Sequence, residues 1–273
     1  MSNILYSIII GLVQGVSEWL PISSKTQVLF VSTLLFNLPL DVAYAFGLFM
    51  EVGSLFSATI YFRREILSLL RDRKLLGYLL VVTIVTGIEG VPLYIISDRL
   101  LSGAYNLGLP MILLGVFLIG DGIYIRYSRK TPRTGTLNDL GLKNFIVVGA
   151  AQGFAALPGV SRSGMTVSTL LFMGVSPKEA FKLSYLAYIP AALGGFVTTI
   201  LFSKTELNAA LSNFDATGIS VAVITAAAVG LVGDRLAVVV HEGERAADRD
   251  AGGDANVAKP RHVHAVRPQP KRA

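Results

Sequence analysis

Residues 157–166 read Leu-Pro-Gly-Val-Ser-Arg-Ser-Gly-Met-Thr and interrupt a stretch that is otherwise apolar. Arg162 stands at its centre, and a charged side chain in the middle of a bilayer costs about 2.5–3.5 kcal/mol even on the scale from insertion experiments. Pro158 and the glycines break the helix, so that backbone N–H groups turn inward. A phosphate group suits the arginine fork, these N–H groups and the nearby residues Gly159, Ser161, Ser163 and Thr166.

The composition of the 273-residue chain is that of a membrane protein: 52% of the residues are hydrophobic, 15% are charged and the mean hydropathy is +0.60. Cysteine is absent, which excludes disulfides, thiolate metal sites and a cysteine nucleophile. The net charge of +6 comes from basic residues in short loops and in the C-terminal tail. It therefore indicates membrane orientation and no nucleic-acid partner. Because Glu18 interrupts the first apolar run, that run is interpreted as part of the mature protein and not as a signal peptide.

Apolar stretches long enough to cross a bilayer recur along the chain, and the predicted spans are 43–62, 75–97, 107–127, 180–203 and 216–234. Two further apolar regions, 4–37 and 144–174, are broken in the middle. Broken backbone at membrane depth is tolerated only where protein or a wet cavity satisfies its polar groups. We therefore predict an all-α polytopic membrane protein in which both broken regions are re-entrant helix pairs.

The basic residues predict the topology. Two loops, 63–74 and 126–143, each carry five lysines or arginines and are separated by two spans, so they lie on the same side, in the cytoplasm. Loop 98–106 and the turn near Asp41 are then outside. The first broken region enters from the outside and the second from the cytoplasm.

This opposition indicates an inverted repeat. Gln14-Gly15, followed by a Leu-Pro break, is echoed 138 positions later by Gln152-Gly153, which is also followed by a Leu-Pro break. Broken helices at matching places of two halves are typical of inverted repeats with a site at the midplane. The alternative is chance similarity of apolar sequence, but the shared polar positions favour repeats over about 1–130 and about 142–240.

The second half lacks a span that the first half has. After residue 235 the composition changes, and residues 241–273 are rich in Ala, Arg, Asp, Pro and His, with all three histidines of the chain. We expect a membrane domain over 1–240 and a disordered polar tail over 241–273, with the last span missing. The tail is either a natural extension or the result of a lost reading frame near residue 235, and we favour the second interpretation.

Three roles are open for Glu18, which lies in the first broken region. It lies four residues after Gln14, so the two share one helix face. Glu18 either pairs with Arg162 to hold the halves together, or serves as a general base, or holds a divalent cation that bridges to a phosphate. With Glu18 as base, Ser24 is a plausible nucleophile. Lys25 is either a second phosphate-binding cation or a lysine that snorkels to the interface.

The two broken segments resemble the signature motifs of the undecaprenyl-diphosphate phosphatase family, the bacitracin-resistance family of membrane enzymes. Its first motif has Glu or Gln, three residues, Glu, and then Pro-x-Ser-Ser, matched here at Gln14, Glu18, Pro21, Ser23 and Ser24. Its second motif, Pro-Gly-x-Ser-Arg-Ser-x-x-Thr, is complete at Pro158, Gly159, Ser161, Arg162, Ser163 and Thr166. The resemblance covers about residues 1–235.

The resemblance implies hydrolysis of a C55-type polyprenyl diphosphate to the monophosphate and inorganic phosphate, which recycles the lipid carrier for cell-envelope glycan synthesis. It implies support by a divalent cation, Mg or Ca, with Glu18 as a ligand. The expected catalytic residues are Glu18, Ser24 and Arg162, with Gln14 and Gln27 in support. The expected phosphate-binding residues are Ser23, Lys25, Gly159, Ser161, Arg162, Ser163 and Thr166.

Two departures from the family affect the chemistry. Many bacterial members have a histidine at the position of Gln27, and glutamine cannot shuttle a proton as histidine can. Gln14 is often glutamate in the family, so a metal site of two carboxylates on this helix is weakened.

The sequence also bears on two other classes of membrane protein. The common histidine-dependent lipid phosphatases need a histidine where this chain has Ser168, so that class fails. A transporter or flippase of polyprenyl phosphate stays open, because discontinuous helices in an inverted repeat are transporter architecture. In either case we expect a multi-pass protein of the plasma membrane that contacts a polyprenyl lipid and forms a homodimer.

Overall fold

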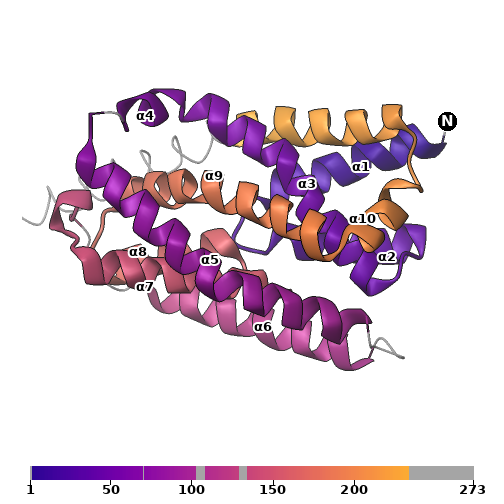
Figure 1. Cartoon of the computed structure of the whole chain (residues 1–273), viewed down its shortest axis with the longest axis horizontal. Coiled ribbons are helices and arrows are strands. Elements are labelled where there is room, and N and C mark those ends of the chain that lie inside the picture. The colour runs from indigo at the N-terminus through magenta and orange to yellow at the C-terminus, as the bar shows by residue number, and fades with distance from the viewer. Residues whose placement is uncertain (1, 70, 103–107, 129–133, 234–273) are drawn as a thin grey trace, which may run out of the picture.

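The computed structural model describes residues 2–69, 71–102, 108–128 and 134–233, and this part of the chain is almost entirely helical (Figure 1). Its only bridge between extended residues joins Gly135 and Val175. The helices are α1 (Ser2–Ser17), α2 (Ser24–Phe36), α3 (Leu40–Tyr61), α4 (Arg63–Ser68), α5 (Arg73–Ser102), α6 (Gly108–Ser128), η1 (Leu137–Asp139), α7 (Leu142–Gly153), η2 (Phe154–Ala156), α8 (Arg162–Phe172), α9 (Pro177–Phe202), α10 (Lys204–Leu211) and a last helix at Ala216–Gly233.

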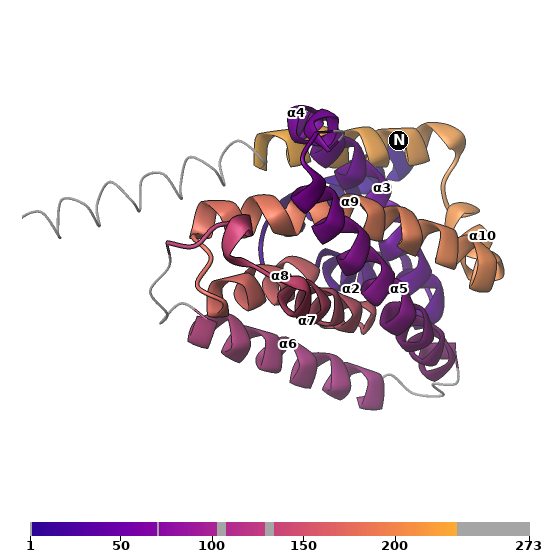
Figure 2. The ribbon, with the colours of Figure 1, turned by 60° about the vertical axis from the view of Figure 1, so that its left-hand side comes forward.

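Five helices in the described part of the chain are long and apolar enough to cross a membrane. They are α3, α5, α6, α9 and the helix Ala216–Gly233, so the five predicted spans are confirmed. The protein is therefore an all-α polytopic membrane protein. Figure 2 shows α6 at the edge of the bundle, where it packs on α8.

The two broken regions form helical hairpins. Residues 18–23 separate α1 from α2, and η2 with the turn after it separates α7 from α8. Both breaks contain the predicted Leu-Pro pair, but Arg162, which the sequence places at the centre of the second interruption, is already the first residue of α8. In Figure 1, α1 begins at the end marked N and α7 begins at the opposite end, so the hairpins enter the bundle from opposite ends. That each hairpin turns back inside a membrane stays a prediction.

The described parts of the two basic loops, 63–69 with 71–74 and 134–143, lie at one end of the bundle, as predicted. The Lys74 ammonium donates a hydrogen bond to the backbone carbonyl of Asn138 at 2.7 Å, which joins the start of α5 to η1. At the other end, the Ser203 hydroxyl donates to the Asp98 carboxylate at 2.8 Å. The two ends thus agree with the predicted topology, while the assignment of the basic end to the cytoplasm stays a prediction.

The order of the elements repeats. Each half has a hairpin, a long helix, a short helix and another long helix. The two short helices are not predicted from the sequence: α4 lies within the predicted loop 63–74, and α10 lies between the predicted spans 180–203 and 216–234. Each begins where the preceding long helix ends, at Phe62 and at Ser203. The predicted tail at 241–273 and the question of a sixth span lie outside the described residues, so the division at residue 240 stays a prediction.

Glycines let each hairpin pack on the other half. A Cβ on Gly149 of α7 would lie 2.7 Å from the Cβ of Val85 on α5, and one on Gly15 of α1 would lie 2.7 Å from the Cβ of Val229 on the last helix. Small residues permit such close approach of membrane helices. The first helix of each hairpin therefore packs against a long helix of the other half: α7 packs against α5, and α1 packs against the helix Ala216–Gly233.

We expect Gly149→Ala to destabilise the protein, because its Cβ would also lie 3.0 Å from the carbonyl oxygen of Val82. Overpacking of this kind costs about 1–3 kcal/mol. The matched control is Gly77→Ala on α5, where an added Cβ has no described atom within 4 Å. Thermal unfolding in detergent should show a lower midpoint for Gly149→Ala alone. Equal midpoints for the two variants would show that this contact does not limit stability.

Candidate active site

The two breaks meet in a polar pocket with room for about one water molecule. Both hairpins contribute to it, and α3 adds one carboxylate. The residues that line the polar pocket are Ser17, Glu18, Leu20, Ser23, Ser24, Lys25, Glu51, Val160, Ser161, Arg162 and Ser163. All three predicted catalytic residues and most of the predicted phosphate-binding residues are therefore brought together.

Glu18 is the centre of this pocket. It is 5% exposed, and its Oε1 accepts a hydrogen bond from Arg162 Nη2 at 2.5 Å. Its Oε2 accepts from the Ser24 hydroxyl at 2.7 Å and from the Gln14 amide at 3.0 Å. The ion pair and the base–nucleophile contact are thus both present, so the geometry accommodates a structural role and a catalytic role for the same carboxylate.

Arg162 keeps donors that no described residue uses. Its side chain is 11% exposed, and its guanidinium lies 4.0 Å from the ring centroid of Tyr188 and 4.8 Å from that of Tyr185. Nη2 is bonded to Glu18, whereas Nε and Nη1 are buried and have no hydrogen-bond partner in the described part of the chain. Buried donors without partners are costly, so their retention indicates a ligand that accepts hydrogen bonds.

The first break is held rigidly. Ser23 has a left-handed backbone with φ of 60°, and its hydroxyl is 2.9 Å from that of Thr26. Lys25 is 5% exposed and donates to the backbone carbonyl of Ala155, so it does not snorkel to an interface in this structure. Gln27 lies outside the polar pocket and donates to the carbonyl of Ile22 at 3.0 Å.

The second break contacts the first hairpin. Gly159 has a φ of +95°, which favours glycine, and its N–H donates to the Thr26 hydroxyl at 2.9 Å. Ser161 caps α8 by accepting from the Gly164 N–H at 3.2 Å, and its hydroxyl lies 3.3 Å from that of Ser163.

Two of the predicted phosphate-binding residues do not line the pocket. The Thr166 hydroxyl donates to the carbonyl of Arg162 at 2.9 Å and lies 2.5 Å from the Ser184 hydroxyl. Gly159 packs against α6, where an added Cβ would lie 2.8 Å from the carbonyl oxygen of Leu114. That Thr166 and Gly159 contact a phosphate directly stays a prediction, and the contacts of Thr166 with Ser184 and of Gly159 with α6 do not favour it.

Sequence reasoning missed Glu51, Tyr185, Tyr188 and Asp121. Glu51 on α3 lines the polar pocket, and Asp121 on α6 accepts a hydrogen bond from Ser161 N–H at 3.2 Å. Both are acids within predicted spans, a rarity that marks functional residues by default and could have singled them out. The tyrosines gave no such signal.

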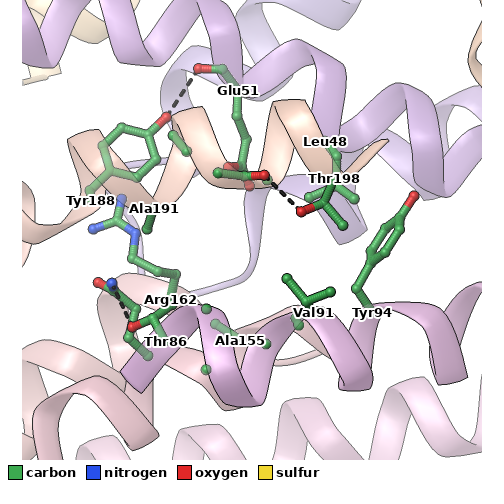
Figure 3. Close-up of a pocket in the computed structure, with 18 of the residues that line it drawn as sticks. Leu48, Glu51, Thr86, Val91, Tyr94, Ala155, Arg162, Tyr188, Ala191 and Thr198 are labelled. Atoms are coloured by element: carbon green, nitrogen blue, oxygen red, sulfur yellow. Dashed lines mark hydrogen bonds between the residues drawn. The ribbon is translucent and has the colours of Figure 1, made fainter. Parts of the chain in front are cut away.

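A larger cavity of about 180 Å³ adjoins the polar pocket. Figure 3 shows it between α5 and α9, with Glu51 above, Arg162 at the lower left and apolar or small residues such as Leu48, Val91 and Ala191 around it. Lys25, Glu51 and Arg162 line both spaces. A ligand with an apolar chain would fit the larger cavity, with its charged head against Lys25, Glu51 and Arg162 where the cavity meets the polar pocket.

Fold and site define a polytopic helical membrane protein with a buried polar centre built from two broken segments. Residues 7–237 match the family described as Bacitracin resistance protein BacA, and the chain belongs to that family, as its motifs predicted.

Curated relatives carry the name undecaprenyl-diphosphatase, and three of them illustrate the range of identity. The protein from Sulfurisphaera tokodaii is 62% identical over 230 residues, which cover 84% of this chain and 86% of the relative. A protein from Saccharolobus islandicus is 56% identical over the same shares of the two chains. One from Pyrobaculum islandicum is 44% identical over 199 residues, or 70% of this chain and 74% of the relative.

Proposed function

We propose that the protein hydrolyses a polyprenyl diphosphate, such as undecaprenyl diphosphate, to the polyprenyl phosphate and inorganic phosphate. The observation that carries this proposal is the buried Arg162 guanidinium, with two unused donors beside the bonded pair of Glu18 and Ser24. The shared name of the relatives supports the same activity. In the cell this reaction recycles the lipid carrier for cell-envelope glycan synthesis.

The site residues divide the work as follows. The Arg162 fork holds the terminal phosphate, with Lys25 and the hydroxyls of the polar pocket as further donors. Glu18 accepts the proton of Ser24, whose Oγ attacks the terminal phosphorus, and the bond to the bridging oxygen breaks. The polyprenyl phosphate leaves, and water then hydrolyses the phosphoserine. The larger cavity takes the first part of the prenyl chain.

Ser24→Ala tests the nucleophile. If Ser24 attacks, turnover should fall by more than about 10⁴-fold, as expected when a nucleophile is removed. The matched control is Ser32→Ala, a buried serine of the same helix outside the pocket. Phosphate release from farnesyl diphosphate measures both. A Ser24→Ala enzyme within about tenfold of normal would mean that water attacks directly, with Glu18 as its base.

A divalent cation, Mg or Ca, is part of the proposal. Within the described residues no group of three or more acidic, histidine or cysteine side chains could hold a metal. Mg²⁺, however, is commonly bound by one or two carboxylates together with substrate phosphates. Glu18 fits this role with Glu51, whose side chain lines the same pocket. When bound, the cation would neutralise charge on the diphosphate.

The transporter alternative is not favoured, because the relatives are named for a phosphatase. Purified protein in detergent separates the two functions, since there is no second compartment. We expect release of phosphate from farnesyl diphosphate, reduced by a chelator. No release in detergent would reject hydrolysis.

We also propose that the protein forms a homodimer in the plasma membrane. Light scattering of the purified protein would test the oligomeric state, and fractionation of cells would test the location.

A further inference from the structure

The buried face of α6 has a carboxylate at its centre. Among residues 109–128 of this helix three are buried, Leu114, Asp121 and Ser128, each seven positions after the last. They lie on the face toward α8, while most of the helix is exposed at the edge of the bundle (Figure 2). An acid in the middle of a membrane-spanning helix is expensive and calls for a partner or a function.

The partner of Asp121 is the loop that carries Arg162. Asp121 is 5% exposed, and its Oδ2 accepts the Ser161 N–H at 3.2 Å. The α8 helix approaches closely here, because a Cβ on Gly164 would lie 3.0 Å from Oδ2. Oδ1 is buried and has no partner among the described residues. Simple packing of α6 on α8 would be better served by an apolar side chain, so packing does not explain the acid.

The loop is held from two sides. From the first hairpin, the Thr26 hydroxyl accepts the Gly159 N–H at 2.9 Å. From α6, Asp121 accepts the Ser161 N–H, one residue before Arg162. The Ser161 N–H belongs to the peptide between Val160 and Ser161, which lies directly before the residue that leads into Arg162, so its orientation helps to set the direction in which the arginine side chain leaves the backbone. Loss of the α6 contact would therefore leave that direction fixed from one side only.

We propose that Asp121 is a positioning residue, which accepts the Ser161 N–H and thereby aims the Arg162 guanidinium at the terminal phosphate of the substrate. The expected effect on KM rests on the proposed function, whereas the hydrogen bond between Asp121 and the Ser161 N–H does not depend on it. Asp121 acts here as a hydrogen-bond acceptor, so a neutral acceptor of the same shape should replace it.

Kinetics of two variants test this role. Asp121→Ala should raise KM for farnesyl diphosphate about 10- to 100-fold, the effect of one lost hydrogen bond to a charged group. Asp121→Asn keeps an acceptor and should restore KM to within about threefold. The control is Tyr124→Phe, which removes the 2.9 Å hydrogen bond from Tyr124 to Thr169 between the same two helices. Its KM should be normal. If Asn is as impaired as Ala, or if Tyr124→Phe raises KM equally, the positioning role is wrong.

Hydrogen–deuterium exchange of residues 157–166 separates this inference from the proposed function. Exchange in detergent should be faster in Asp121→Ala than in the wild type, Asp121→Asn and Tyr124→Phe. If the wild type releases no phosphate, the proposed function fails, and exchange alone decides the role of Asp121. Unchanged exchange in Asp121→Ala would overturn the inference whatever the activity.

Discussion

Arg162→Ala should abolish hydrolysis of the diphosphate, with a loss of about 10³- to 10⁵-fold in turnover, as for arginines that stabilise phosphoryl transfer in other enzymes. Arg162→Lys should recover little. The guanidinium holds Glu18 with one nitrogen, lies over Tyr188 and has two nitrogens left for the phosphate. A lysine ammonium is a point charge and cannot serve these partners in one plane. Phosphate release from farnesyl diphosphate measures the loss.

Loss of Arg162 also leaves a buried Glu18 without its charge partner, which destabilises proteins in general. The double variant Glu18→Gln with Arg162→Ala separates the two effects. It should regain thermal stability in detergent and stay inactive. A Lys variant with near-normal turnover would contradict the phosphate-binding role of the arginine fork.

Glu18→Gln should lower turnover by at least about 10²-fold, the low end for removal of a general base. Glutamine keeps the shape of the side chain and one acceptor for Ser24, but it cannot take up the hydroxyl proton or add charge to a cation site. Glu65→Gln on α4 is the control, since Glu65 lies outside the pocket. The same assay measures both variants. Full activity in Glu18→Gln would reduce Glu18 to a structural partner of Arg162.

Most of the fold follows from local features of the sequence. Long apolar runs predict helices that span, and proline with glycine at membrane depth predicts breaks, because both signals act within about one helical turn. The pairing of Glu18 with Arg162 could be predicted for a different reason. Two charges in apolar segments have few other partners, so they are expected to find each other.

The remaining parts depend on contacts between segments far apart in the chain. Tyr188 and Glu51 reach the site only because α9 and α3 pack together. Thr166 depends on such a contact too: its place in the motif predicts a phosphate contact, which stays a prediction, while α9 brings the Ser184 hydroxyl within 2.5 Å of its own hydroxyl. The short helix α10 was missed because a segment of eight residues carries little periodic signal.

Phosphorus NMR of the purified full-length protein in detergent with a long-chain polyprenyl diphosphate tests the central claim most directly. The diphosphate signals should be replaced by those of polyprenyl phosphate and inorganic phosphate in equal amounts, and Arg162→Ala protein should leave them unchanged. A folded wild-type protein that leaves the diphosphate intact, or an Arg162→Ala protein that converts it equally well, would contradict hydrolysis at this site.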